Sequence, residues 1–200
     1  MTQANFEGAR QYALRRLQQE LLPKFVYHSL WHTQDEVLPA SEQLAALEAV
    51  AADDLLLLRT AALFHDVGFT VRRAGHEEAG RQIAAEVLPG FGYHPSQIAV
   101  IGGIIIATKL PQSPHTRLEE IIADADLDVL GREDFMLRNQ VLREELAAFG
   151  SITTDRQWLS TQLKFLKNHH YFTAAARSLR DGQKKKNVEA LNQLLACLPG

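Results

Sequence analysis

Apolar residues recur at helical spacing along nearly the whole chain. Residues 6–22 show the pattern first, with Phe6, Ala9, Ala13, Leu14, Leu17 and Leu21 on one face and Pro23 after them. Two isoleucine runs, 104–106 and 121–122, favour strands locally but lie inside longer helical patterns. We therefore predict an all-α fold, with helices over about residues 6–22, 27–38, 41–52, 53–68, 77–88, 95–108, 118–130, 134–149, 155–166 and 172–198.

The segment 53–68 is apolar on nearly every face, so it is expected to be the central helix. Gly68 is expected to close it in the left-handed conformation. Near its end stand His65 and Asp66, two polar groups that are costly to bury without partners. A hydrogen-bonded histidine–aspartate pair in the core is one explanation. A divalent metal ion is the other, because neutral imidazole and carboxylate are both good ligands.

Composition narrows the class of protein. The 200 residues are 46% hydrophobic and 22% charged, with a net charge of -3, which is typical of a globular domain and not of a surface that binds nucleic-acid polymers. We expect one domain over residues 1–200. The single cysteine, Cys197, suits a reducing compartment, and neither a secretory signal nor a membrane span is visible. The sequence therefore predicts a cytoplasmic protein without membrane partners.

Further metal-ligating residues lie on other predicted helices. His28 and His32 are four residues apart, which would place them on one helix face, and Asp126 interrupts an otherwise apolar stretch. His32, His65, Asp66 and Asp126 can thus meet from three helices. Two imidazoles and two carboxylates, with two positions left to water, suit an octahedral ion such as Mn²⁺, Fe²⁺, Co²⁺, Ni²⁺ or Mg²⁺.

The order His…His-Asp…Asp resembles the HD-domain superfamily of metal-dependent phosphohydrolases. The resemblance covers roughly residues 25–135, and the stretches 106–112 and 124–135 are similar to those of a bacterial subgroup of predicted metal-dependent phosphohydrolases. It implies an HD-type helical bundle, with the C-terminal helices of residues 134–198 packed on the motif-bearing core. The segments that carry it are Tyr27-His28-Ser29-Leu30-Trp31-His32-Thr33, followed by Val37; Ala61-Ala62-Leu63-Phe64-His65-Asp66-Val67-Gly68-Phe69; and Ala123-Asp124-Ala125-Asp126-Leu127-Asp128.

The resemblance implies that the metal ligands are His32, His65, Asp66 and Asp126. Asp126 is preferred over its acidic neighbours because the family's ligand follows alanine in an Ala-Asp pair, and because Leu127 fits the context best. Binuclear members carry further histidines before the last aspartate, where this chain has Thr108-Lys109. One divalent metal ion is therefore expected.

The implied activity is hydrolysis of a phosphomonoester or phosphodiester, most simply that of a nucleotide, by water that the ion activates. Asp66 would orient that water, and His28 matches the position of a general acid in phosphodiesterase relatives. His28 could equally pack against Tyr27 or orient a ligand. The remaining candidates are Arg72, Arg73 and Lys109, as phosphate clamps or plain surface charges, and His76, near the substrate or simply at a helix start.

Two other functions stay open at this stage. One is a non-catalytic HD scaffold that binds a nucleotide or a metal; the other, a di-iron oxygenase, needs more histidine ligands than can be placed. The expected partner in the main hypothesis is a small phosphate ester or nucleotide. The amphipathic C-terminal stretch, with Val188, Leu191, Leu194, Leu195 and Leu198, could pack on its own domain or on a second copy of the chain.

Overall fold

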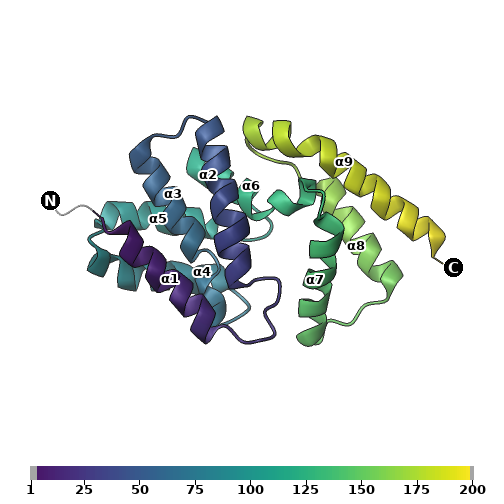
Figure 1. Cartoon of the computed structure of the whole chain (residues 1–200), viewed down its shortest axis with the longest axis horizontal. Coiled ribbons are helices and arrows are strands. Elements are labelled where there is room, and N and C mark those ends of the chain that lie inside the picture. The colour runs from purple at the N-terminus through teal and green to yellow at the C-terminus, as the bar shows by residue number, and fades with distance from the viewer. Residues whose placement is uncertain (1–3, 199–200) are drawn as a thin grey trace. The chain divides into compact units, whose positions relative to one another are not determined.

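The computed structural model describes residues 4–198, and every regular element among them is a helix (Figure 1). The predicted all-α fold is confirmed. No helix of the described part is long and apolar enough to cross a bilayer. The elements are α1 (Phe6–Glu20), the π-helix η1 (His32–Val37), α2 (Leu38–Leu47), α3 (Ala52–Phe64), η2 (Val67–Thr70), α4 (His76–Val87), η3 (Leu88–Phe91), α5 (Pro95–Ile106), α6 (Arg117–Asp126), η4 (Asp128–Gly131), α7 (Phe135–Ala148), α8 (Asp155–Asn168) and α9 (Ala174–Cys197).

The chain forms two compact units, one of residues 4–22 and 28–126 and the other of residues 23–27 and 127–198. The first unit is built around α3, against which α1, α2, α5 and α6 pack (Figure 1). Leu58 and Phe64 of α3 are fully buried, as are Ile101 and Ile105 of α5. The expectation that this apolar segment is the central helix is confirmed, and its burial explains why nearly every face of it is apolar.

The predicted helix over residues 27–38 begins later than the sequence pattern indicates. Helical structure starts at Leu30, and η1 then continues directly into α2, with Pro39 tolerated in the first turn of that helix. The segment before it belongs to the second unit. There the Tyr27 N–H donates to Glu145 Oε2 at 2.8 Å, which fixes the backbone in a non-helical path. His28 therefore lies just outside the helix that carries His32.

Gly68 has a different role from the left-handed cap that was predicted. Its φ is not positive, and the chain continues from it through η2. A Cβ on Gly68 would lie 1.8 Å from the carbonyl oxygen of His76 and 2.6 Å from the amide nitrogen of Gly80. The prediction was wrong because the glycine serves close packing of η2 on α4, a long-range contact that spacing along the chain does not reveal.

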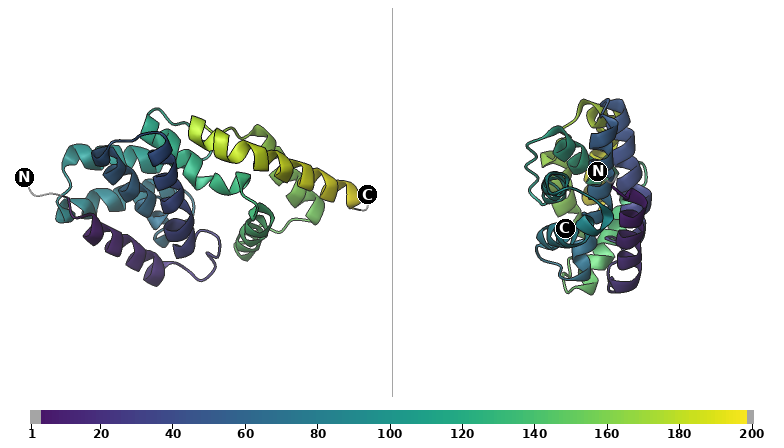
Figure 2. Two further views of the ribbon diagram at one scale, coloured as in Figure 1. Left: turned by 45° about the horizontal axis from the view of Figure 1, so that its top comes forward. Right: turned by 90° about the vertical axis from the view of Figure 1, so that its left-hand side faces the viewer.

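The second unit consists of η4 and the helices α7, α8 and α9, with α8 and α9 packed side by side (Figure 2). Its core includes Leu130, Phe135, Leu166 and Leu191. Asp128, at the start of η4, accepts two hydrogen bonds from the guanidinium of Arg180, at 2.6 and 3.0 Å. This bidentate pair gives Asp128 a structural role within the second unit.

Candidate metal centre

His65 and Asp66 follow the last residue of α3, where the chain turns into η2. His65 is fully buried and Asp66 is 3% exposed. The Nδ1–H of His65 donates to the carbonyl oxygen of Ala62 at 2.8 Å. Because one ring nitrogen is occupied in this way, the other, Nε2, carries the lone pair when the ring is neutral.

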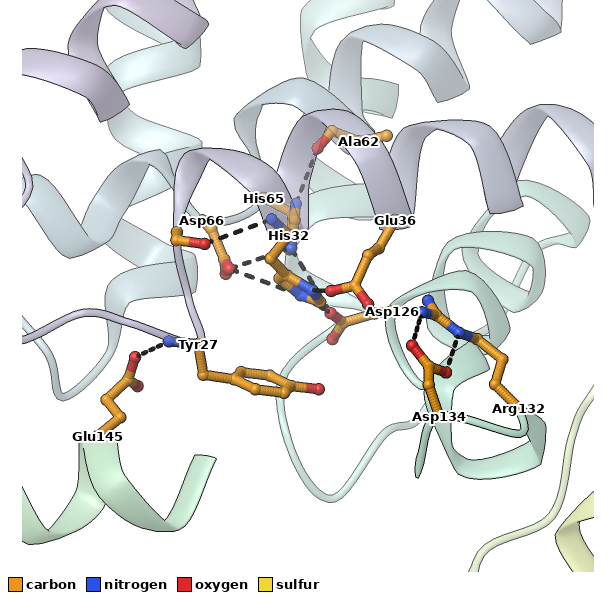
Figure 3. Close-up of polar contacts among 11 residues, drawn as sticks. Tyr27, His32, Glu36, Ala62, His65, Asp66, Asp126, Arg132, Asp134 and Glu145 are labelled. Carbon is orange, nitrogen blue, oxygen red and sulfur yellow. Dashed lines mark hydrogen bonds and ion pairs between the residues drawn. The ribbon is translucent and has the colours of Figure 1, made fainter. Parts of the chain in front are cut away.

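His32 opens the π-helix η1 and is 2% exposed. Its Nδ1 donates to Glu36 Oε2 at 3.0 Å, within the same short helix. Nε2 of His32 therefore points the same way as Nε2 of His65, toward the carboxylates of the site (Figure 3). Sequence reasoning missed Glu36. The signal that could have found it was a carboxylate four residues after a predicted ligand, on the same helix face.

The carboxylates of Asp66 and Asp126 converge on these two nitrogens (Figure 3). Asp126, the last residue of α6, places Oδ1 3.2 Å from His32 Nε2 and 3.5 Å from His65 Nε2. Oδ2 of Asp66 lies 3.3 Å from His65 Nε2 and 3.9 Å from His32 Nε2. The structure thus brings together the four side chains that the sequence singled out, from three separate segments of the first unit.

This donor set fits a divalent ion. Ligand atoms about 2.1 Å from an octahedral ion, at right angles to each other, are about 3 Å apart, and the separations between imidazole nitrogens and carboxylate oxygens here run from 3.2 to 3.9 Å. His65 Nε2 and Asp66 Oδ2 are buried and make no hydrogen bond among the described residues. Buried polar atoms without hydrogen bonds are rare and call for another partner. Imidazole and carboxylate ligands suit Mn²⁺, Fe²⁺, Co²⁺ and Ni²⁺, and carboxylates also suit Mg²⁺.

The electrostatics of the cluster also favour a cation. For the pKa of each of these four groups, burial is the largest single cause and disfavours the charged form. The hydrogen bonds and charges of the neighbouring groups act in the opposite direction and together outweigh burial. Hydrogen bonds with Asp126 and Glu36 raise the pKa of His32 to about 9, and the charge of Asp66 holds the pKa of His65 well above its usual value. The two histidines in turn lower the pKa of Asp66 and of Asp126. Metal binding would therefore displace protons from the two imidazoles.

Two other predicted residues, His28 and His76, flank this cluster. The His76 ring stacks on Phe69, with centroids 3.7 Å apart, and its Nε2 lies 3.5 Å from Asp66 Oδ1. The centroid of His28 is 4.7 Å from that of Phe69 and 6.0 Å from that of His32. Although His28 is not part of a helix as predicted, it still lies beside His32. Both imidazoles are placed where they could exchange protons with a bound ligand.

The cationic residues that were predicted to bind phosphate are exposed and lie outside the cluster of four side chains. Arg72 is exposed and donates from Nε to the carbonyl oxygen of Gly75 at 3.2 Å; Arg73 is also exposed. Lys109 is exposed and lines a cavity of about 930 Å³ between α4, α5 and the loop after α5, together with Arg81 and His115. The lining of this cavity includes none of the four clustered side chains. The structure therefore does not bring Lys109 into the cluster.

Comparison with known proteins adds evidence on the fold. No family model matches the sequence, and no curated protein matches it at a significant level. Solved structures do match across nearly the whole chain. A predicted HD superfamily hydrolase from an uncultured Thermotogales bacterium is 19% identical with a TM-score of 0.64, covering 93% of this chain and 91% of its own.

Two further structures are similar to the same extent. YpgQ of Bacillus subtilis, solved in complex with ADP, is 18% identical with a TM-score of 0.68, covering 98% of this chain and 96% of its own. A Lactobacillus plantarum protein is 17% identical with a TM-score of 0.69, covering 98% of this chain and 97% of its own. The chain therefore has the HD-domain fold, as the motifs predict.

Proposed function

We propose that this chain with an HD-domain fold is a metal-dependent phosphohydrolase that acts on a small phosphate ester, most simply a nucleotide. The observation that carries the proposal is the convergence of His32, His65, Asp66 and Asp126, with imidazole nitrogens and carboxylate oxygens 3.2 to 3.9 Å apart in a cluster that is buried except for part of Asp126. These four side chains would hold one divalent ion. Their arrangement leaves room in an octahedral shell for water and for a substrate oxygen.

When bound, a divalent ion would supply Lewis acidity, lowering the pKa of a coordinated water and withdrawing charge from a phosphoryl oxygen. The protein's part is to hold and orient the reactants. Asp66 has one oxygen directed at His65 and the other 3.5 Å from His76 Nε2. A carboxylate in this position could accept a hydrogen bond from the attacking water and align it with phosphorus.

Protonation of the leaving oxygen needs a second group. His28 and His76 are the candidates, because both lie beside the cluster, and His76 retains 19% of its side-chain exposure. An imidazole within reach of the leaving oxygen can serve as a general acid. We assign this step to His28, with His76, whose ring centroid lies 6.4 Å from that of His28, contacting the substrate.

The substrate class is supported by charge and by one relative. YpgQ was solved with ADP, and the fold it shares with this chain could accept a similar ligand. Arg72 and Arg73 are exposed in the loop that leads to His76, and guanidinium groups match phosphate in a bidentate manner. Lys109 would contribute only if the substrate extends toward its cavity.

The test is a hydrolysis screen of phosphomonoesters, phosphodiesters and nucleotides with Mn²⁺, Fe²⁺, Co²⁺, Ni²⁺ or Mg²⁺ added. Wild-type protein and His65→Ala are purified in parallel. We expect turnover of at least one nucleotide by the wild type, reduced by 10³-fold or more in the variant, on the order of what loss of a metal that activates the nucleophile costs. Equal turnover by both proteins would refute the proposed role of the cluster.

A further inference from the structure

A buried carboxylate, that of Glu36, is hydrogen-bonded to one of the proposed ligands, His32. The side chain of Glu36 is only 5% exposed, and its Oε2 accepts the Nδ1–H of His32 at 3.0 Å. A buried carboxylate is costly unless it is hydrogen-bonded, so a position of this kind normally has a specific role. The contact uses Nδ1 of the ring, whereas Asp126 and Asp66 lie near Nε2.

The local backbone places His32 and Glu36 on the same face of one short helix. His32 and Glu36 both belong to η1, a π-helix of six residues between Leu30-Trp31 and α2. Single π-turns inside longer helices are rare and occur frequently at functional sites. In this one, His32 and Glu36 share a helix face, and the buried neighbours Thr33 and Val37 fix the helix in the first unit.

The two proposed imidazole ligands are held differently. Nδ1 of His65 donates to a neutral carbonyl oxygen, that of Ala62, at 2.8 Å. Nδ1 of His32 donates to a carboxylate at 3.0 Å. Both contacts select the tautomer in which Nε2 carries the lone pair that can bind a cation, but a carboxylate also makes the ring a stronger donor to the metal.

We infer that Glu36 is a positioning residue of the metal centre, which acts through His32 by fixing its tautomer and ring orientation and by raising its basicity as a ligand. The inference rests on the proposed function, because it requires the ion that the four clustered side chains would hold. It assigns a fifth residue to the centre, one that is not itself a ligand. It also accounts for a carboxylate that is buried next to a histidine instead of exposed on the helix surface.

The experiment measures Mn²⁺ affinity of the full-length metal-free protein by calorimetric titration. Glu36→Gln keeps the size of the side chain and a neutral acceptor oxygen; Glu36→Leu removes the acceptor. We expect Glu36→Leu to weaken Mn²⁺ binding by about 10- to 100-fold and Glu36→Gln by less, since outer-shell partners typically contribute this much. At saturation all variants should still bind one ion per chain.

Glu145→Gln is the matched control. Glu145 is also a buried glutamate, 1% exposed, but it accepts a backbone N–H, that of Tyr27, and belongs to the second unit. It should lower thermal stability without changing Mn²⁺ affinity. A second readout is the visible spectrum of the Co²⁺-loaded protein, which we expect to shift in both Glu36 variants and to stay unchanged in the control.

The outcomes separate this inference from the proposed function. The role of Glu36 would be overturned if Glu36→Gln and Glu36→Leu both fold, bind Mn²⁺ with wild-type affinity and show an unchanged Co²⁺ spectrum. This result would leave the metal centre intact. If Glu36→Leu fails to fold, the Co²⁺ spectrum and affinity of Glu36→Gln decide. A wild-type protein that binds no ion, or a His65→Ala protein that binds it equally well, would overturn the centre itself and the inference with it.

Discussion

Asp126 Oδ1 lies 3.2 Å from His32 Nε2, although 94 residues separate the two along the chain. The contact joins the end of α6 to the start of η1, two elements that pack against each other in the first unit. A hydrogen bond of this kind between a buried imidazole and a partly buried carboxylate depends on the whole helical framework being in place. The proposed centre is therefore a consequence of the fold, and it should respond to changes in any of the segments that build it.

The choice of Asp126 over Asp128 can be tested with two matched substitutions. Asp126→Asn should abolish or strongly weaken binding of a divalent ion, because an amide is a poorer ligand than a carboxylate. Asp128→Asn removes the charge that pairs with Arg180 in the second unit. It should lower the free energy of unfolding by about 1–3 kcal/mol and leave metal content unchanged. Elemental analysis measures the metal content of both variants, and urea denaturation measures their stability. Loss of the ion in Asp128→Asn, with the ion retained in Asp126→Asn, would assign the ligand to Asp128.

The metal-free protein should lose stability between about pH 6.5 and pH 9. The pKa of His32 rises from 6.5 to about 9 on folding, so its protonated form stabilises the fold fully below pH 6.5, and this contribution disappears as the pH passes about 9. It amounts to roughly 3 kcal/mol. The carboxyl pKa values of Asp66 and Asp126 are lowered, so their contribution is present above about pH 4 and is lost toward acid.

A bound ion should reverse the alkaline part of this profile. Because the ligands must be deprotonated, Mn²⁺ should stabilise the protein more at pH 8.5 than at pH 6. Thermal unfolding with chelator and with Mn²⁺, across this pH range, checks both statements. An alkaline loss of stability that persists unchanged in a His32→Gln protein would contradict the assignment to His32.

His28→Ala should separate chemistry from metal binding. If His28 protonates the leaving oxygen, the variant should keep its ion and lose about 10²- to 10⁴-fold in kcat. The loss should be much smaller for a p-nitrophenyl ester, whose leaving group needs little protonation. Steady-state kinetics on both kinds of substrate measure this. An equal loss on the two would mean that His28 positions the substrate or a ligand and does not donate the proton.

Gly68→Ala should be strongly destabilising, because its Cβ would lie 1.8 Å from the backbone oxygen of His76. Either η2 or the start of α4 must move, at a cost of about 3 kcal/mol or more. The displacement would also shift His76 away from Asp66. Gly90→Ala is the control, since a Cβ there meets no atom within 4 Å. Urea denaturation of the metal-free proteins should show a lower free energy of unfolding for Gly68→Ala and almost no change for Gly90→Ala.

The helical class and the central helix could be predicted because apolar periodicity records burial directly. The segment that became α3 is apolar on nearly every face, and the structure buries Leu58, Ala62 and Phe64 completely. The four clustered side chains could be predicted because their order along the chain, His…His-Asp…Asp, resembles that of the HD-domain superfamily. Their roles as ligands stay predictions, as does the activity.

What the sequence did not reveal depends on contacts between distant segments. The helix was expected to include His28, but the hydrogen bond from Tyr27 to Glu145, 118 residues away, holds the chain in another conformation. The role of Gly68 depends on His76 and Gly80, which only the folded chain brings near. Glu36 was missed because a carboxylate on a helix is usually a surface charge, and only its burial identifies it as part of the site.

The central claim is that the cluster holds one divalent ion, and elemental analysis of the purified protein tests it most directly. Wild-type protein and the His65→Ala/Asp66→Ala double variant are compared, each after incubation with Mn²⁺ and with Fe²⁺ followed by desalting. We predict about one ion per chain in the wild type and none above background in the double variant. Absence of metal from the wild type, or equal metal in both proteins, would contradict the account.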